Sequence, residues 1–373
     1  MTKPYQICTR CILDTSDPGI SFDQEGVCIS CRNFDAYVKP IWTPDERGKQ
    51  KLDAYVAQIR DEGKNEEYDS IIGLSGGVDS SYLAYVAKKL GLRPLAVHVD
   101  AGWNSELAVK NIEQLVKSLG IDLHTHVVDW EEMRDLQVAF LKSGVANQDT
   151  PQDHAIFGAL YACAVKNKIW HVLNGTNYAT ESLSSSASGY IAMDLRQLKG
   201  IHRRFGERPL KTFPTVSFFQ YYVYYPFIKR MRIHRLLDYM PYNKDEAMKV
   251  LQQELGWRYY GSKHYESRFT KFFQGYYLPT RFGFDKRRLH LANLILSGQM
   301  TRDEALRIMS QPAYPPEELN EDKIFVVKKL GLTMEEFEQL LTAPKKTFRD
   351  YPSNYLLFGL KERIMSVVRR ARA

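Results

Sequence analysis

The feature that most constrains the fold is a glycine- and serine-rich run, Ser75-Gly76-Gly77-Val78-Asp79-Ser80-Ser81, set between two segments of regular pattern. Residues 68–74 have the length and apolar composition of a buried parallel strand, and residues 80–90 have helical spacing. Two glycines let the backbone approach an anion, and a helix start offers unpaired N–H groups and the positive end of its dipole. The run therefore predicts a phosphate-binding loop between a strand and a helix.

Strand-like and helix-like segments alternate around this loop. We expect strands at 68–74, 94–100, 122–128 and 170–174, and helices at 51–62, 80–90, 107–119 and 153–167. Repeated βα units of this length predict an α/β fold with a doubly wound parallel sheet, whose ligands bind at the carboxyl ends of the strands. Because the loop does not end in the Gly-Lys-Ser/Thr of a Walker A motif, it does not predict γ-phosphoryl transfer of the P-loop kind.

Beyond residue 285 the pattern becomes helical. We expect helices at 286–296, 301–309, 317–330 and 334–341, each opened by a capping or acidic residue. The serine-rich run 182–189, directly after the fourth strand, is expected to be a mobile loop. The predicted domains are a cysteine ribbon at 1–40, an α/β domain at 41–284 and a helical region at 285–373.

Four of the five cysteines lie in the first 31 residues, as two Cys-x-x-Cys pairs: Cys8, Cys11, Cys28 and Cys31. The sixteen residues between the pairs give the spacing of a four-cysteine zinc ribbon. A module of about 40 residues is too small to be stabilised by apolar burial alone, so a structural Zn²⁺ ion would supply much of its folding energy. A reactive or iron–sulfur site is the less favoured interpretation of the same pattern.

Charge and hydropathy limit the possible environments. The net charge is +7, but residues 201–235 carry +7 and residues 258–290 carry +6, so the rest of the chain carries −6. Such local basicity favours a phosphate-rich ligand at one or two sites, although a solvated basic face has the same composition. The sequence shows neither an apolar run long enough for a transmembrane segment nor a secretory signal, so we expect a cytoplasmic protein.

The run Ser75–Ser81 resembles the PP-loop of the ATP pyrophosphatases, the group that contains asparagine synthetase, NAD synthetase, GMP synthetase and the tRNA thiolases. These enzymes cleave ATP to AMP and pyrophosphate, so the resemblance implies a Rossmann-like fold that uses ATP and Mg²⁺. It implies that Asp79 helps to carry magnesium and that Asp100, Gly175 and Thr176 contact the adenosine. The residues implied to hold pyrophosphate are Ser75, Gly76, Gly77, Ser80 and Ser81.

Two further segments, 174–181 (Asn-Gly-Thr-Asn-Tyr-Ala-Thr-Glu) and 256–273, resemble the signature of the N-acetyl sugar amidotransferases of the WbpG and PseA type. The cysteine pairs and residues 285–290 (Asp-Lys-Arg-Arg-Leu-His) fit the same family in order. The resemblance implies conversion of an acetamido group on a nucleotide-linked sugar to an acetamidino group, in bacterial surface-polysaccharide (O-antigen) or flagellin-sugar biosynthesis.

The chemistry implied is activation of an amide oxygen. Its attack on the α-phosphate of ATP gives an O-adenylyl imidate, from which ammonia displaces AMP. The expected catalytic residues are Asp79, Lys263, His264, Glu266 and Lys271, with Lys263 or Lys271 on the α-phosphate and His264 or Glu266 handling a proton from ammonia. The expected substrate contacts are Asn177, Glu181, Lys286 and Arg287. A purely structural interpretation of these residues stays open, because the lysines of 256–273 are also typical of a solvent-exposed helix and Glu181 is also typical of the start of a helix.

Ammonia is expected from a partner. A glutaminase needs a nucleophilic cysteine with its base, whereas the one cysteine outside the ribbon, Cys163, lies in an apolar helical run. The family resemblance implies two partners, similar to the glutaminase and cyclase subunits of imidazole-glycerol-phosphate synthase. The aromatic run 218–227 is a candidate docking surface, with core packing or membrane-surface contact as alternatives.

Two other functions compete. A PP-loop tRNA thiolase would also join cysteine pairs to this loop and would use the basic segments for tRNA. Thiolases need further cysteines in the catalytic domain, which argues against it and against a nucleic-acid partner. The third possibility is a non-catalytic nucleotide-binding assembly subunit, which sugar-dependent AMP release would exclude.

Overall fold

A single five-stranded parallel sheet forms the centre of the computed structural model, which describes residues 4–261, 265–361 and 363. The strand order is β3-β2-β1-β4-β5, and every neighbouring pair is parallel. The strands are β1 (Ser70–Gly73), β2 (Pro94–Asp100), β3 (Leu123–Val127), β4 (His171–Leu173) and β5 (Arg232–His234).

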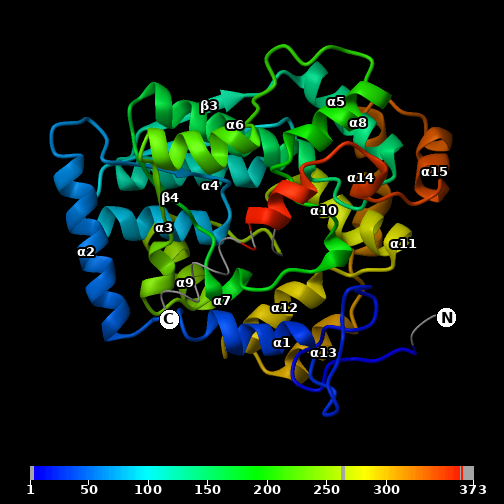
Figure 1. The fold of residues 1–373 in the computed structure, drawn as a ribbon, viewed down its shortest axis with the longest axis horizontal. Helices are drawn as coiled ribbons and strands as arrows, with labels where there is room; N and C mark the ends of the chain where they lie inside the picture. The colour runs from blue at the N-terminus through cyan, green and yellow to red at the C-terminus, as the bar shows by residue number, and fades with distance from the viewer. Residues whose placement is uncertain (1–3, 262–264, 362, 364–373) are drawn as a thin grey trace.

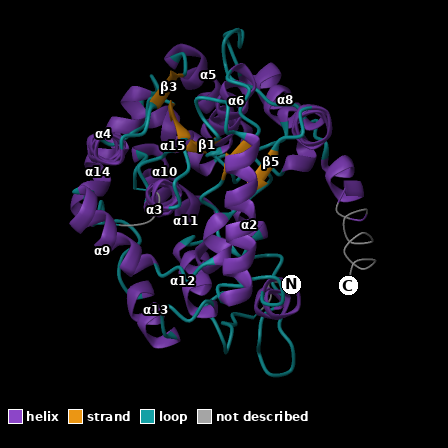
Figure 2. Ribbon diagram, turned by 90° about the vertical axis from the view of Figure 1, so that its left-hand side faces the viewer, coloured by secondary structure: helices purple, strands orange, loops and turns teal. Residues whose placement is uncertain are grey.

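Helices cover both faces of this sheet, as Figure 2 shows, so the predicted doubly wound α/β architecture is confirmed. Alternating side chains of β1 point to opposite faces, because Ile71 and Ile72 belong to different apolar clusters. The cluster around Ile72 draws on α2 (Glu46–Glu62), α3 (Val78–Lys89), α4 (Glu106–Leu119) and α9 (Lys244–Leu255). The cluster around Ile71 draws on α5 (Trp130–Ser143), α6 (Thr150–Lys166) and α8 (Leu195–Phe205).

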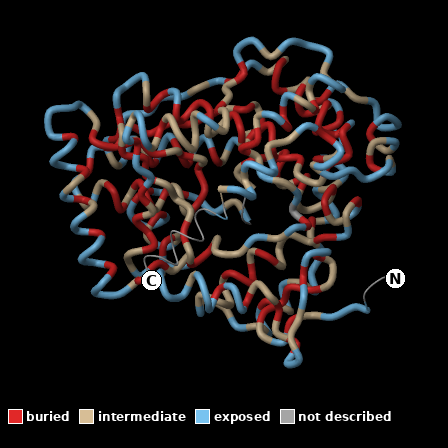
Figure 3. Tube along the Cα trace, viewed as in Figure 1, coloured by how far each residue is buried: buried red, intermediate tan, exposed pale blue. Residues whose placement is uncertain are grey.

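The C-terminal region is helical, as expected. It comprises α10 (Arg268–Phe272), α11 (Leu278–Phe282), α12 (Arg287–Leu296), α13 (Arg302–Met309), α14 (Pro316–Lys329) and α15 (Met334–Thr342). Phe269, Phe272 and Phe337 belong to the same buried cluster as Ile71. One apolar cluster therefore joins the sheet to these helices, whose buried residues are red in Figure 3, and the domain limits at 40 and 284 stay a prediction.

The N-terminal ribbon packs against the C-terminal helices. It contains α1 (Ile29–Asn33) and two isolated antiparallel bridges, Ile7 with Asp14 and Phe22 with Cys28. Ile12 is fully buried in a small cluster with side chains of α12 and α13, and Figure 1 shows the dark-blue N-terminal segment beside these helices. The N-terminal ribbon and the helices α12 and α13 thus form one structural unit.

Some elements differ from the expectations. The short edge strand β5 and the helix α5 were not predicted. The fold also contains the short helix α7 (Tyr178–Glu181) and π-helical segments at Phe34–Val38, Gln220–Ile228 and Phe273–Tyr277. Three 3-10 turns lie at Ser186–Ser188, Leu236–Tyr239 and Phe348–Asp350. Among the described residues, the helices are too short or too polar to cross a membrane.

The serine-rich run 182–189, which is expected to be a mobile loop, forms hydrogen bonds with the ribbon. The hydroxyl of Ser185 donates to Asp17 Oδ2 over 2.6 Å, and that of Ser186 donates to Asp17 Oδ1. The amide of Gly19 donates to Ser186 Oγ over 3.0 Å. The ribbon therefore anchors the segment that directly follows α7, an interaction between positions too distant in sequence for composition to indicate.

Candidate active site

The strand order reverses between β1 and β4, and the glycine- and serine-rich loop lies at this switch point. Ser75 follows β1 and Gly175 follows β4, and both line a cavity of about 360 Å³ at the carboxyl ends of the strands. A Cβ on Gly175 would lie 3.3 Å from Ser80 Cα, so the two loops are in close contact. This is the position at which doubly wound sheets bind their ligands.

The backbone of the loop requires glycine at one position. Gly76 has φ +83°, and a Cβ there would lie 2.9 Å from the carbonyl oxygen of Ala108 in α4. The indole Nε1 of Trp257 donates to Gly76 O over 3.0 Å and fixes the turn from the other side. Gly77 then caps α3, with its own amide donating to Ser75 Oγ over 3.2 Å. The first amides of α3 are thus presented at the cavity, where an anion would be stabilised by them and by the helix dipole.

Asp79 lies in the first turn of α3 and is oriented by three neighbours. Asn177 Nδ2 donates to Asp79 Oδ1 over 3.2 Å, Thr180 Oγ1 donates over 3.4 Å, and the Tyr242 hydroxyl also donates to this oxygen. Burial, together with the Asp79 charge, holds the pKa of Tyr242 well above its usual value, so this hydroxyl keeps its proton. Asn177 is fully buried and caps α7 by accepting from Thr180 N over 2.9 Å.

Asp100 does not line the cavity itself but orients Asn104, which does. Its Oδ1 accepts from Gly102 N over 2.8 Å and from Asn104 Nδ2 over 3.0 Å. Asn104 Nδ2 also reaches His98 Nε2 over 3.0 Å, while His98 Nδ1 lies 2.9 Å from Leu74 O. Because a carbonyl can only accept, His98 Nδ1 carries the proton and Nε2 accepts from Asn104. His98 and Asn104 line the cavity, whereas Asp100 lies behind them.

A second wall of the cavity is formed by α6, α10 and the start of α12. Thr270 Oγ1 donates to Asp149 Oδ1 over 3.0 Å and accepts from Gln152 Nε2 over 2.9 Å, and Gln274 Nε2 donates to Asp149 Oδ2 over 3.2 Å. Lys286 and Asp153 line the same wall. Burial and the Asp149 charge raise the pKa of Asp153 to about 7, with Lys286 opposing them.

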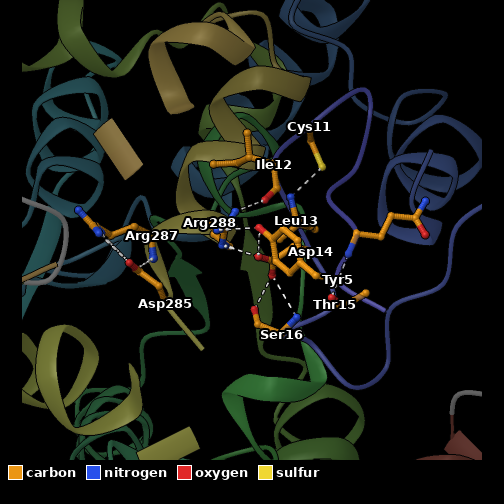
Figure 4. Close-up of polar contacts among 11 residues, drawn as sticks. Tyr5, Cys11, Ile12, Leu13, Asp14, Thr15, Ser16, Asp285, Arg287 and Arg288 are labelled. Atoms are coloured by element: carbon orange, nitrogen blue, oxygen red, sulfur yellow. Dashed lines mark hydrogen bonds and ion pairs between the residues drawn. The ribbon is translucent and has the colours of Figure 1, made fainter. Parts of the chain in front are cut away.

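Consecutive residues at the start of α12 face different surroundings. Lys286 lines the cavity, Arg287 pairs with Asp285 over 2.7 Å, and Arg288 pairs with Asp14 of the ribbon over 3.0 Å (Figure 4). Arg288 also donates to Ile12 O over 2.8 Å. The ribbon therefore fixes the segment that presents Lys286 to the cavity.

A second cleft of about 780 Å³ adjoins the first, because Asn104 and Tyr260 line both. Arg287 and Lys271 lie in this second cleft. The ammonium of Lys271 is already paired with Asp322 over 2.9 Å and with Glu318. Aromatic side chains, Trp103, Tyr265 and Phe325, complete much of its lining.

The four ribbon thiols are close enough to bind one metal ion, since all lie within 4.8 Å of one another. The Sγ–Sγ distances are 3.8 Å for Cys8–Cys31, 3.7 Å for Cys11–Cys28 and 3.5 Å for Cys28–Cys31. Four Zn–S bonds of about 2.3 Å in a tetrahedron place the sulfurs about 3.8 Å apart, so the donor set fits zinc. The amides of Cys11 and Cys28 point at Cys8 Sγ over 3.4 and 3.2 Å, as expected around a thiolate.

The site residues predicted around ATP and the substrate fall into four groups. Those brought together in the first cavity are Ser75, Gly77, Asp79, Ser80, Gly175, Thr176, Glu181, Glu266 and Lys286. Gly76, Ser81, Asp100 and Asn177 lie outside its lining, and Lys271 and Arg287 belong to the second cleft. Lys263 and His264 fall outside the described residues.

Several cavity residues were not predicted, among them Asp149, Gln152, Asp153 and Lys244. A sequence signal for the first three exists. In a doubly wound fold the N-termini of the helices lie at the carboxyl ends of the strands, so polar residues in the first turn of α6 face the ligand. Lys244 starts α9, which follows the unpredicted strand β5.

A glycine- and serine-rich loop at the switch point of a parallel sheet defines an ATP pyrophosphatase domain of the PP-loop class. Residues 51–208 match the family model of NAD synthase. Residues 266–365 match the family model described as LPS biosynthesis protein WbpG-like, C-terminal domain. The chain is thus similar to NAD synthase in its α/β part and to WbpG-like proteins in its C-terminal part.

Individual proteins match shorter parts of the chain. A segment of 129 residues is 31% identical to GMP synthase [glutamine-hydrolyzing] of Thermus thermophilus and covers 35% of this chain and 23% of that protein. A segment of 91 residues is 37% identical to tRNA(Ile)-lysidine synthase of Chlamydia pneumoniae and covers 24% of this chain and 27% of that protein. The matches thus span about a quarter of these relatives. The structure of the NH3-dependent NAD synthetase from Campylobacter jejuni aligns with a TM-score of 0.30 at 15% identity, covering 80% of this chain and 98% of that one.

Proposed function

We propose that this protein is an ATP-dependent amidotransferase that converts an acetamido group of a nucleotide-linked sugar to an acetamidino group, releasing AMP and pyrophosphate. The proposed pathway is bacterial surface-polysaccharide (O-antigen) or flagellin-sugar biosynthesis. The observation that carries the proposal is one cavity that joins the PP-loop to residues of the WbpG-like C-terminal segment, Glu266 and Lys286 among them. The nucleotide-binding loop and the family-specific segment therefore share one site.

The phosphate groups of ATP would lie against the amides at the start of α3. Ser75 and Ser80, whose hydroxyl oxygens are 3.1 Å apart, would donate to them, and Gly76 and Gly77 permit the close approach. Ser81 Oγ is buried, has no hydrogen-bond partner among the described residues and lies outside the cavity lining, so its predicted contact with a phosphate is not supported by its position. Asp79 would help to hold Mg²⁺, with phosphate oxygens as further ligands. The adenosine would lie beyond Thr176 and Asn104, with Asp100 orienting Asn104.

The α-phosphate requires a cation, and the geometry favours Lys286 over Lys271. No hydrogen bond or ion pair from the described residues engages the Lys286 ammonium, which lines the cavity. Lys271 is held by two carboxylates in the other cleft, so its expected role on the α-phosphate is not supported by its position. Lys263 keeps its predicted role as a proposal. Glu266 lies against the PP-loop, with Oε1 3.3 Å from the position of a Cβ on Gly77.

The second cleft is proposed to hold the nucleotide-linked part of the sugar. Its aromatic lining suits stacking of a base. Arg287 and Arg268 also line it, but they are engaged by Asp285 and by Glu321 and Asp322, so a phosphate would have to compete with these carboxylates for them. Because the two clefts meet at Asn104 and Tyr260, an acetamido group could reach the α-phosphate from it. Glu181 lines the first cavity as a proposed substrate contact, whereas the buried Asn177 would act on the substrate only by positioning Asp79.

Zinc and an ammonia source complete the proposal. The ribbon would bind one structural Zn²⁺ ion, which would fix the contacts of Arg288 and Asp17 with the catalytic domain. Ammonia would come from separate glutaminase and cyclase-like subunits. In the proposed docking run 218–227, Phe219 and Phe227 are exposed while Tyr225 stacks on Tyr161, so only part of the run is available to a partner.

The test is AMP and pyrophosphate release from ATP with magnesium and ammonium, comparing nucleotide-linked diacetamido sugars with bulk tRNA. We expect AMP only with a sugar, and a product in which one oxygen is replaced by NH. AMP that appears only with tRNA would contradict the proposal and favour tRNA modification, the chemistry named for one relative. ATP binding without AMP under any condition would favour a non-catalytic assembly subunit.

A further inference from the structure

We propose that Asp153 is the base that removes a proton from the ammonia nitrogen as ammonia displaces AMP from the activated amide. This inference rests on the proposed amidotransferase function and assigns a step of that reaction. Asp153 lies in the first turn of α6 and lines the cavity that also contains the PP-loop and Lys286.

The reaction requires such a base. The amide oxygen attacks the α-phosphorus, the bond from that phosphorus to the bridging oxygen breaks, and pyrophosphate leaves. The imidate formed in this way still carries the amide N–H proton and one positive charge. The lone pair of ammonia then forms a C–N bond with the imidate carbon while the C=N pair returns to the amide nitrogen, so the positive charge moves to the new nitrogen. One proton must leave this nitrogen before the C–O bond breaks and AMP departs with the bonding pair, because otherwise the product would carry two positive charges. After its loss the product is a singly charged amidinium.

The surroundings of Asp153 suit a proton acceptor. No hydrogen bond or ion pair from the described residues reaches its carboxyl group, which is enclosed by protein yet keeps access to the cavity. Its neighbour Asp149 is different, because two donors, Thr270 Oγ1 and Gln274 Nε2, stabilise its charged form. An acidic pair with one member stabilised as an anion leaves the other free to exchange a proton.

The pKa of Asp153 is matched to this task. Burial and the Asp149 charge raise it to about 7, while Lys286 lowers it, and a general base is most effective when its pKa is near the working pH. The other charged side chains that line the cavity are Asp79, Glu181, Lys244 and Glu266. Of these, Asp79 and Glu266 are placed at the PP-loop, so they would face the phosphates rather than the incoming ammonia.

Two half-reactions separate the role of Asp153 from that of the whole site. Sugar-dependent exchange of labelled pyrophosphate into ATP, without ammonium, measures adenylylation alone. We expect Asp153→Asn to keep this exchange and to lose about 10²- to 10⁴-fold in amidine formation. At a constant concentration of free ammonia, the wild-type rate should rise with pH through a midpoint near pH 7 to a plateau at higher pH, and Asp153→Asn should lack that rise. Asp153→Glu should recover part of the rate, and Asp61→Asn, at an exposed position on α2, should match the wild type.

The outcomes are distinguishable. If the wild type shows neither sugar-dependent exchange nor AMP release, the proposed function itself fails. If the wild type is active and Asp153→Asn forms amidine at the wild-type rate with the same pH rise, Asp153 is not the base. Equal loss of both half-reactions would also overturn the inference, because it would place Asp153 in binding. Should Asp153→Asn fail to fold, Asp153→Ser, which also lacks a titratable group, decides in the same comparison of half-reactions, and a wild-type rate with the wild-type pH rise in that variant would contradict the role.

Discussion

Replacing Gly76 by alanine tests whether the loop is built on close backbone contact. The new Cβ would lie 2.9 Å from Ala108 O and 3.3 Å from Ala108 Cα, atoms of α4 that cannot rotate away. The left-handed φ of +83° costs about 1–2 kcal/mol for an L-residue, and overpacking adds about 1–3 kcal/mol. We therefore expect the free energy of unfolding to fall by about 2–5 kcal/mol.

Gly120→Ala is the matched control. Gly120 ends α4 with φ +56° and has no atom within 4 Å of its Cβ position, so only the conformational cost of about 1–2 kcal/mol applies. Displacement of the PP-loop in Gly76→Ala should also cost at least one charge-assisted hydrogen bond, which corresponds to about 10- to 150-fold weaker binding of ATP·Mg²⁺. Denaturant unfolding and calorimetric titration measure both quantities. Equal stability of the two variants, with unchanged ATP affinity, would refute the close-contact reasoning.

Three further predictions concern the ribbon and the cations. Arg288→Met leaves the Asp14 carboxylate, which is 3% exposed, without its ion-pair partner, so the free energy of unfolding in urea should fall by about 3 kcal/mol. Arg47→Met, at a side chain that is 76% exposed, should lower this free energy by less than about 1 kcal/mol. Equal losses would show that the ion pair between the ribbon and α12 is unimportant for stability. Cys11→Ser should lose the single equivalent of zinc and lower Tm, and retention of zinc by elemental analysis would exclude the four-thiolate site. Lys286→Met should lower kcat by about 10²-fold with ATP affinity nearly unchanged, whereas Lys271→Met should mainly lower the stability of the fold. The reverse pattern in steady-state kinetics would support the predicted contact of Lys271 with the α-phosphate.

The sequence predicts the sheet well where burial dominates. The second strand is expected at 94–100 and is observed at Pro94–Asp100, because a continuous apolar run covered on both faces leaves one interpretation. The edge strand β5 was missed because three residues, two of them basic or imidazole, do not form an apolar run. Its hydrogen bonds to β4 are non-local and leave no mark in local composition.

The residues that line the candidate cavity were predicted in part. The PP-loop, Glu266 and Lys286 share a cavity as expected, since strand ends and a family signature indicate them. Lys271 does not join them, because its partners on α14 lie about 50 residues further along the chain and compete for its charge. Asp153 was overlooked because its raised pKa depends on burial in the folded protein, which sequence spacing does not show.

The fate of the amide oxygen tests the central claim most directly. A nucleotide-linked diacetamido sugar labelled with oxygen-18 in the acetamido carbonyl would be incubated with ATP, magnesium and ammonium, and AMP analysed by mass spectrometry. Activation of the amide oxygen on the α-phosphate predicts that the label appears in AMP, one atom for each amidine formed. Amidine formation with unlabelled AMP, or AMP released without any change in the sugar, would contradict the account.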